Sequence, residues 1–341
     1  MKTINAFDYL SQFEKIHIKI TDKFFNKLKN KIIKEYGIKK FGILLKVNPN
    51  TFISEFRRNI YHPFYRILKI SQVFKINREE LYDNILGFYP WGSHRKNYLK
   101  ISRELNVGEF FVEGYALYFA EGDNGSNGKT RPRKFRFTNS EPSVINFMIN
   151  WIETYFPNNE FYVSIINPKS KFMDFDKAKK LINHNKIKFE EENYNKVVKY
   201  KIHLDYAIII DLILSIELII KELCSKDPKL AAAYIRGMMI GEGTAYFNKS
   251  RYVRIEMRNE KEIKYLHKLF IMLEFDCAPT LRSNRHNMWS LYIGAKQLDK
   301  FAREIGFGVH QERQRILERG INKILKVNQY CWYLTKTNLV L

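Results

Sequence analysis

Residues 1–100 carry hydrophobic side chains three or four positions apart, the spacing that places them along one face of an α-helix. Stretches such as "KFFNKLKNKIIKEYG" and "FYRILKISQVFKI" follow this pattern. Residues that interrupt helices separate these stretches: Gly37, Asn48-Pro49, His62-Pro63 and Asn77. The pattern therefore predicts four or five short helices in an all-α domain over residues 1–100.

A different pattern follows from residue 227 onward, where helical and alternating segments succeed one another. Asp227-Pro228 is typical of a helix start, with the aspartate as N-cap and the proline in the first turn. This helix is expected to run to about Gly241. Beyond it we expect two strands, a helix, two more strands and a last helix, at residues 244–250, 252–259, 260–275, 278–286, 289–296 and 297–307. The order αββαββα defines a predicted domain over residues 227–341.

The block over residues 105–223 shows the same order of elements, with an insertion rich in lysine and asparagine before its last strand. Its first helix ends in Glu121-Gly122, and the first helix of the later block ends in Glu242-Gly243, 121 residues further along the chain. A fixed spacing between matching features indicates an internal repeat. The chain is therefore predicted to be an α+β protein with two pseudo-symmetric αββαββα repeats, preceded by the helical domain.

Small residues lie four positions apart on the first helix of the second repeat: Ala233, Gly237 and Gly241. Such positions share one side of a helix, and small side chains there let two helix backbones approach closely. The corresponding positions of the first repeat are partly small as well: Val112, Ala116 and Ala120. We expect the two helices to pack on each other about a pseudo-twofold axis, which would place Glu121 and Glu242 side by side.

The composition adds a strong positive charge. The 341 residues include 58 Lys or Arg and 36 Asp or Glu, for a formal net charge of +22. Such an excess attracts polyanions, and nucleic acid is the first candidate.

Two neighbouring carboxylates repel each other unless a charge neutralises them, and their oxygens suit a divalent cation such as Mg²⁺. Metal-binding carboxylates beside a basic surface indicate cleavage of phosphodiester bonds. The alternative is a pair of ordinary helices whose last glutamates face solvent.

The cysteine and hydropathy patterns favour an intracellular protein. Cys224, Cys277 and Cys331 form no Cys-x-x-Cys pair, which argues against a disulfide framework or a structural zinc site. The most apolar run, residues 206–220, is too short to span a bilayer and contains Asp211. We therefore expect a cytoplasmic protein with no membrane partner.

Two nine-residue segments resemble the motif of a known family. "IRGMMIGEG" (residues 235–243) and "GYALYFAEG" (residues 114–122) resemble the LAGLIDADG motif of homing endonucleases, and the strand and helix order after each copy is similar as well. The resemblance covers residues 105–325 and is to the monomeric members with two motifs. It implies paired β-sheets that form a saddle over the DNA major groove, and it implies that Glu121 and Glu242 hold the metal ion.

The resemblance also suggests residues that support the metal site. The segments "FRFTNSE" and "RIEMRNE" place Asn139 and Asn259 where the family has a polar residue that orders water near the metal. The alternative for either asparagine is a turn residue or a helix N-cap. The family often has a basic residue late in the sheet that supports the active site. The resemblance places it at Lys201 in the first repeat and at Tyr292 in the second. The alternative for Lys201 is a solvated strand lysine.

Basic residues cluster on the predicted strands, whose alternating side chains would reach a DNA groove. Arginine suits both guanine edges and phosphates, and the sequence leaves open which residues read bases. The candidates are Arg131, Arg133, Lys134, Arg136, Arg251, Arg254, Arg258, Arg282 and Arg285.

Residues 38–76 resemble a helix-turn-helix of the phage-repressor type, with Lys46 where the turn usually has a glycine. Hydrophobic residues are expected to line its first two helices: Phe41, Leu44, Leu45, Ile53 and Phe56. The second helix would present polar side chains to the major groove. These side chains are Asn50, Thr51, Ser54, Arg57 and Arg58. The alternative is a plain helical cap on the nuclease domain.

These features together predict a monomeric, site-specific DNA endonuclease of the homing type, encoded by an intron or an intergenic element. It would use Mg²⁺ to hydrolyse both strands of double-stranded DNA. Two alternatives keep the same scaffold. One is a transcription regulator that binds DNA without cutting it, and the other is an intron maturase that binds RNA.

Overall fold

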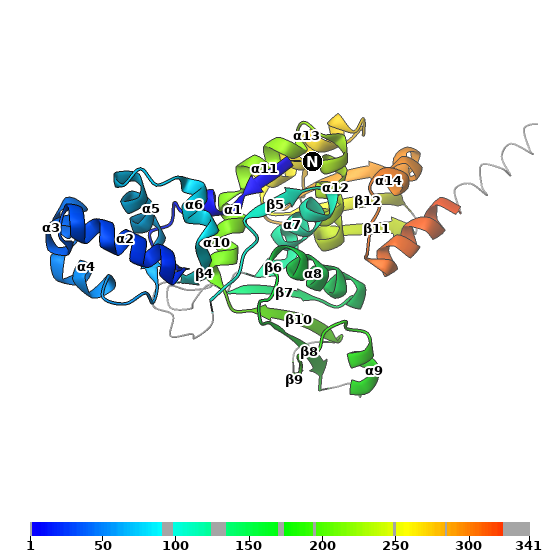
Figure 1. Ribbon diagram of the computed structural model, residues 1–341. Helices are drawn as coiled ribbons and strands as arrows, with labels where there is room; N and C mark the ends of the chain where they lie inside the picture. The colour runs from blue at the N-terminus through cyan, green and yellow to red at the C-terminus, as the bar shows by residue number, and fades with distance from the viewer. Residues whose placement is uncertain are drawn as a thin grey trace, which may run out of the picture.

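The computed structural model describes residues 2–90, 98–123, 134–169, 174–193, 196–247, 250–283 and 285–322. The helices of residues 22–83 gather at one end of the molecule, at the left in Figure 1, and two larger β-sheets with their covering helices form the rest. The α+β class predicted from the sequence is confirmed.

The helices of the N-terminal part begin and end close to the predicted interruptions. They are α1 (Ala6–Leu10), α2 (Asp22–Glu35), α3 (Ile38–Leu44), α4 (Pro49–Glu55), α5 (Phe64–Val73) and α6 (Arg78–Asp83). The Asn48 side chain accepts hydrogen bonds from the amides of Asn50 and Thr51, and Pro49 opens the helix, so α4 starts with an N-cap and a proline. Asn77 caps α6 in the same way.

The N-terminal part is not all-α, and that prediction was wrong. An antiparallel sheet of order β3-β2-β4 is formed by β2 (Ile16–Ile20), β3 (His62–Pro63) and β4 (Ile85–Pro90). The alternation in "IHIKI" is a strand signal, but it is only five residues long and stands beside a long helical pattern. In addition, β1 (Lys2–Asn5) pairs with β5 (Glu104–Val107). The start of the chain therefore joins the segment before α7 (Glu109–Glu121), the helix that carries the first of the two repeated motifs.

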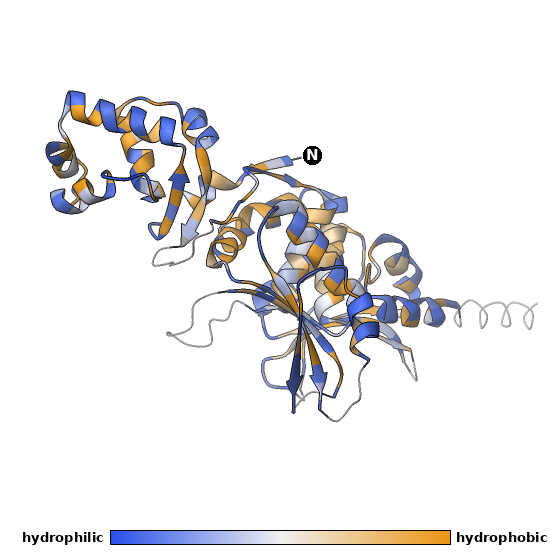
Figure 2. Cartoon of the chain, turned by 60° about the horizontal axis from the view of Figure 1, so that its bottom comes forward, coloured by the Kyte–Doolittle hydropathy of each residue, from blue (hydrophilic) through white to orange (hydrophobic). Residues whose placement is uncertain are grey.

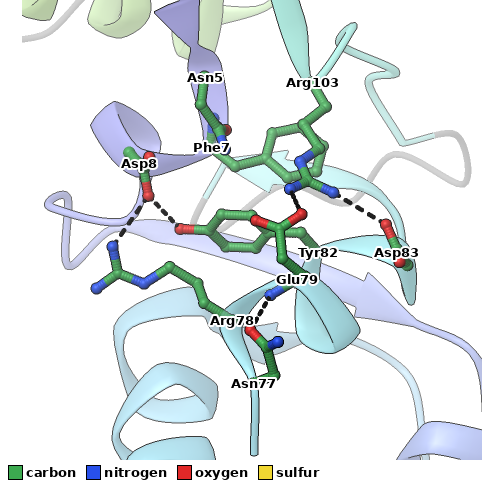
Figure 3. A network of polar contacts seen from close by, with 9 residues as sticks. All are labelled: Asn5, Phe7, Asp8, Asn77, Arg78, Glu79, Tyr82, Asp83 and Arg103. Atoms are coloured by element: carbon green, nitrogen blue, oxygen red, sulfur yellow. Dashed lines mark hydrogen bonds and ion pairs between the residues drawn. The ribbon is translucent and has the colours of Figure 1, made fainter.

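Polar contacts tie α6 to both of these segments, as Figure 3 shows. Asp8 of α1 accepts a hydrogen bond from the Tyr82 hydroxyl at 2.6 Å. Arg103, just before β5, forms ion pairs with Asp83 at 2.9 Å and with Glu79. Charged groups from α1, α6 and the β5 segment therefore meet around one buried tyrosine.

The second large unit has the predicted αββαββα order. Its elements are α12 (Pro228–Glu242), β11 (Gly243–Phe247), β12 (Arg251–Met257), α13 (Glu260–Met272), β13 (Thr280–Leu281), β14 (Trp289–Gly294), η1 (Ala295–Gln297) and α14 (Leu298–Glu304). Asp227 caps α12 as predicted. The sheet order is β11-β12-β14-β13, and a further helical segment covers residues 311–322.

The first large unit repeats this arrangement with additions. Its elements are α7 (Glu109–Glu121), β6 (Gly122–Asp123), β7 (Phe135–Asn139), α8 (Pro142–Tyr155), β8 (Tyr162–Pro168), α9 (Phe175–Lys180), β9 (Ile187–Glu192), β10 (Lys199–Leu204), α10 (Ala207–Ser215) and α11 (Glu217–Cys224). The sheet order β6-β7-β10-β8 matches that of the second unit, and β9 adds a parallel edge strand. The predicted insertion thus contributes α9 and β9.

The hydrophobic core is centred on the first helix of each unit, α7 and α12. Figure 2 shows hydrophobic residues concentrated in the helices at the centre of the molecule. The sheets bury one face against helices, as Val253 and Ile255 of β12 do beside Ile263 and Leu266 of α13. Within the described ranges, no helix combines the length and apolar character that crossing a membrane requires.

A polar network joins the last helix of the first unit to the second unit. The Lys221 ammonium lies 2.6 Å from carboxylate oxygens of both Glu217 and Glu262. The Tyr234 hydroxyl donates to Glu262 at 2.7 Å, and only 2% of the Glu262 side chain is exposed. The buried carboxylate therefore depends on Lys221 for its countercharge.

Replacing Lys221 with methionine is expected to lower the free energy of unfolding by about 2 kcal/mol, because it leaves the Glu262 charge buried without its cation. The value is below that of a fully buried pair since the lysine side chain is 20% exposed. Denaturant unfolding measures it. Lys226→Met, which breaks an exposed pair with Glu222, is the control and should cost less than about 1 kcal/mol. Equal losses in the two variants would contradict the prediction.

Candidate metal and nucleic-acid site

The close packing predicted for the two motif helices is confirmed. A Cβ atom added at Gly237 of α12 would lie 2.3 Å from the Glu113 carbonyl oxygen of α7. One added at Gly241 would lie 2.5 Å from the Ala120 Cβ and 3.0 Å from the Glu121 Cγ. Side chains at these positions would force the helices apart, so the small residues set the distance between them.

Each motif helix passes directly from its last residue, a glutamate, into a strand. The glycine that follows has an extended backbone and donates its amide to the last helical turn, Gly122 to Tyr118 and Gly243 to Met239. A Cβ atom would lie 2.3 Å from the Tyr118 carbonyl oxygen at Gly122 and 2.4 Å from that of Met239 at Gly243. The glycines therefore allow the abrupt turn that leaves each glutamate at a helix end.

The Glu121 and Glu242 carboxyl groups influence each other electrostatically. Burial and, second, the charge of Glu242 raise the pKa of Glu121 to about 7, while Arg313 and Lys199 act in the opposite direction. Burial also raises the pKa of Glu242, and Arg313 opposes that change. Because the Glu121 side chain contacts the position just before Glu242, the helix packing itself explains why the two carboxylates interact.

These carboxylates fit a divalent cation. Within the described residues, neither accepts a hydrogen bond or forms an ion pair. The same part of the chain contains no group of three His, Cys, Asp or Glu side chains that could hold a metal on their own. Mg²⁺ is commonly bound by one or two carboxylates together with water and substrate phosphates. The half-buried Glu121 and the exposed Glu242, neither paired within the described residues, match that pattern of incomplete protein ligation.

Arg313, in the helical segment 311–322, was missed by the sequence analysis. Its Nη1 donates to the carbonyl oxygens of Met239, Ile240 and Gly241 at 3.1, 2.6 and 3.0 Å. Burial lowers the pKa of this arginine, while the Glu121 and Glu242 charges raise it. A guanidinium that binds the last carbonyls of a helix stabilises that end, which here carries Glu242. No local motif around Arg313 marks this role.

The register of the strands changes the predicted correspondence between Lys201 and Tyr292 of the two repeats. Gly122 pairs with Phe137 and Gly243 pairs with Ile255, so Thr138 corresponds to Glu256. Lys201 faces Thr138 and Ser290 faces Glu256. Lys201 therefore corresponds to Ser290, and the match with Tyr292 was wrong. The sequence motifs alone could not show this shift, because the loops before β7 and β12 differ in length.

Asn259 serves as a helix N-cap and Asn139 as a turn residue, the alternatives that the sequence left open. The Asn259 side chain accepts from the Glu262 amide at 3.2 Å, at the start of α13. The Asn139 side chain accepts from the Glu141 amide at 2.9 Å, just before α8. Lys201 lies on the outer face of β10 with Lys199, and of the two it is Lys199 whose charge acts on Glu121.

The predicted DNA-contacting residues of the sheets fall into distinct groups. Arg131 and Arg133 lie outside the described residues. Lys134 and Arg136 both pair with Asp205, at 3.5 and 2.5 Å. Arg251 is the first residue of β12, and Arg258 directly follows its last residue. The structure brings three candidates together around Glu256, namely Arg254, Arg282 and Arg285.

The N-terminal candidates lie on α4 or directly after it, and all are exposed: Asn50, Thr51, Ser54, Arg57 and Arg58. Gly42 of α3 allows close contact with α4, since an added Cβ would lie 3.1 Å from that of Phe52. Lys46, between the helices, has a φ of 58°, the left-handed conformation that glycine favours. The prediction that Leu44 and Ile53 pack inside was wrong, because Phe41, Phe52 and Phe56 fill that core and leave them 53% and 40% exposed.

Comparison with known proteins finds similarity over part of the chain. Residues 229–306 match the family model of the LAGLIDADG-like domain. A search of curated proteins found no match. Among solved structures, the chain is similar to I-DmoI in complex with DNA and Mn, with 12% identity, coverage of 59% of this chain and 98% of that chain, and a TM-score of 0.39.

Two further solved structures are similar at the same level. One is the homing endonuclease I-WcaI bound to its DNA recognition sequence, with 10% identity, coverage of 62% and 88%, and a TM-score of 0.38. The other is the N-terminal LAGLIDADG domain of DUF199/WhiA, with 14% identity, coverage of 59% and 86%, and a TM-score of 0.35. These TM-scores are low, so the function has to be derived from the chain's own residues.

Proposed function

We propose that the protein is a site-specific, metal-dependent DNA endonuclease with two LAGLIDADG-type repeats. The observation that carries the proposal is a pair of carboxylates at the ends of two helices in close contact, Glu121 half-buried and Glu242 exposed, neither of which has a partner among the described residues. The match of residues 229–306 to the LAGLIDADG-like domain supports it, and so does the net charge of +22. Both halves of the site lie on one chain, so we propose that the enzyme acts as a monomer.

Glu121 and Glu242 would hold the divalent ion, and Mg²⁺ is the proposed ion because it suits carboxylate and phosphate oxygens. When bound, such an ion supplies positive charge to a scissile phosphodiester. Arg313 keeps the end of α12, and with it Glu242, in place. Lys199 and Lys201, on the outer face of β10, would contact DNA phosphates near the cut. The outer faces of the two sheets together would form the DNA-binding saddle.

The experiment that tests the proposal is cleavage of a randomised duplex library with Mg²⁺, beside a reaction containing EDTA. We expect discrete cuts at one sequence, with loss of all cuts in EDTA. Enrichment of one sequence by binding without cuts would identify a DNA-binding protein and refute the nuclease proposal. Preferential retention of structured RNA over DNA at moderate salt would favour the maturase instead.

We further propose that α3 and α4 act as a helix-turn-helix that contacts DNA next to the cut site. The short turn, the left-handed backbone at Lys46 and the exposed polar side chains of α4 support this. Asn50, Thr51 and Ser54 would face base edges, and the arginines after α4 would contact phosphates.

The double variant Arg57→Gln, Arg58→Gln is expected to bind the selected DNA about tenfold more weakly at fixed salt, because phosphate contacts dominate such affinity. The cut position should stay the same, since the metal site is elsewhere. Fluorescence anisotropy and mapping of the cut ends measure the two properties. The control Lys23→Gln, Lys34→Gln removes two exposed positive charges from α2. If both variants weaken binding equally, α3 and α4 are only a structural cap.

A further inference from the structure

One carboxylate on the outer face of the second sheet holds three arginines. Glu256, on β12, lies 3.0 Å from Nη1 of Arg282 and 3.1 Å from Nη2 of Arg254. Arg285 lies 3.5 Å away and is largely exposed. The Glu256 side chain is only 12% exposed. The arginines come from β12 itself and from the segment after β13, so this carboxylate connects two parts of the sheet.

Tyrosines on the same face restrict the arginines further. The Tyr292 hydroxyl accepts a hydrogen bond from Nη1 of Arg282 at 2.6 Å. The guanidinium carbon of Arg254 lies 5.7 Å from the ring centroids of both Tyr252 and Tyr292. This distance allows cation–π attraction. Both guanidinium groups are therefore held by Glu256 and by tyrosines before any ligand is present, Arg254 through two rings and Arg282 through a hydroxyl.

The charge balance of the cluster is unusual for a surface that binds a polyanion. Three guanidinium groups share one carboxylate, so the cluster keeps an excess of positive charge. The carboxylate itself repels DNA, and for affinity alone the sheet would be better without it. Its benefit is geometric, because without it the neighbouring guanidinium groups would repel each other and adopt many rotamers. Fixing them in advance lowers the entropy lost on binding at one particular geometry.

We propose that Glu256 is a positioning residue that sets the base preference of the protein by holding Arg254 and Arg282 for contact with base edges. The inference rests on the proposed DNA-binding function and assigns its specificity to this cluster. A planar guanidinium discriminates bases only when its orientation is fixed, because bidentate contact with guanine needs both donors in place. In the described part of the first sheet, Thr138 occupies the position that corresponds to Glu256, and Arg136 pairs with Asp205 instead.

The test uses the full chain and a duplex library with a randomised centre, from which one enriched duplex and a scrambled version are taken. Glu256→Gln is expected to lower the affinity ratio of enriched to scrambled duplex by about tenfold, the range of one lost bidentate contact. The slope of log affinity against log salt concentration should become steeper by about one released counterion, since an arginine freed from Glu256 would contact a phosphate. Glu256→Asp, which keeps the charge, should keep the salt dependence of the unaltered protein.

The matched control is Glu260→Gln, which removes one negative charge from α13, on the other side of the sheet, where it pairs with Lys264. It should change neither the affinity ratio nor the salt dependence. If Glu256→Gln does not fold, Arg282→Lys serves instead, because it keeps the charge but loses the planar fork, and the ratio should again fall about tenfold.

An unchanged ratio in folded Glu256→Gln or Arg282→Lys would overturn the inference while leaving the proposed function standing. Equal changes in Glu256→Gln and Glu260→Gln would overturn it too, since net charge alone would then explain them. If the unaltered protein enriches no sequence from the library, the proposed function fails and the inference fails with it.

Discussion

Replacing Glu242 with glutamine is expected to lower the rate of Mg²⁺-dependent DNA cleavage by about a thousandfold and to leave DNA affinity nearly unchanged. Glutamine keeps the size of the side chain but removes the charge that binds the metal ion. The ion contributes several kcal/mol of charge stabilisation in such reactions, and each 1.36 kcal/mol is a factor of ten in rate. Single-turnover cleavage of the selected duplex, with binding measured in Ca²⁺, separates the two effects.

Glu121→Gln should have the same effect, because both carboxylates are proposed to hold the ion. The control is Glu109→Gln, which changes an exposed glutamate at the opposite end of α7. This variant should cleave DNA at the rate of the unaltered protein. Cleavage that persists in both Glu121→Gln and Glu242→Gln would place the active site elsewhere. Loss of DNA binding together with cleavage would mean that the carboxylates support the structure rather than the chemistry.

The parts of the fold that the sequence predicted are those specified by local chemistry. Asp227 caps α12 and Pro228 begins it, because an N-cap acceptor and a fixed φ are sufficient signals for a helix start. Gly237 and Gly241 predicted the contact between α7 and α12, since a backbone can approach another only where side chains are absent. The same two helices carry Glu121 and Glu242, so the candidate metal site was predicted together with the helix packing.

The parts that the sequence did not show depend on contacts between distant residues. The sheet of β2, β3 and β4 joins three short segments that are far apart along the chain, and only their pairing stabilises them. Arg313 reaches α12 from 72 residues or more further along the chain, so no spacing rule could find it. Glu256 was overlooked because the sequence marked its arginines as separate DNA contacts rather than as partners of one carboxylate.

Replacing Gly237 with alanine is expected to lower the free energy of unfolding by about 3 kcal/mol. The added Cβ would lie 2.3 Å from the Glu113 carbonyl oxygen and 2.9 Å from the Leu117 amide nitrogen. These are backbone atoms of α7, so no rotamer change relieves the overlap and the two helices must separate. Overpacking of this kind typically costs 1–3 kcal/mol, and an unyielding backbone favours the upper end. Alanine otherwise favours a helix over glycine by about 1 kcal/mol, so a net loss can come only from the helix contact.

The control for this change is Gly294→Ala at the end of β14, where an added Cβ meets no atom within 4 Å. Its free energy of unfolding should stay within about 0.5 kcal/mol of the unaltered protein. Denaturant unfolding of both variants compares their stabilities. The rate of DNA cleavage by Gly237→Ala, measured under conditions in which the variant is folded, gives a second test. Because Gly241 contacts the Glu121 side chain, helices that move apart also separate the two carboxylates, so cleavage should fall even where the variant remains folded. Equal stability of Gly237→Ala and Gly294→Ala would show that the helices tolerate separation and that their contact does not fix the distance between the glutamates.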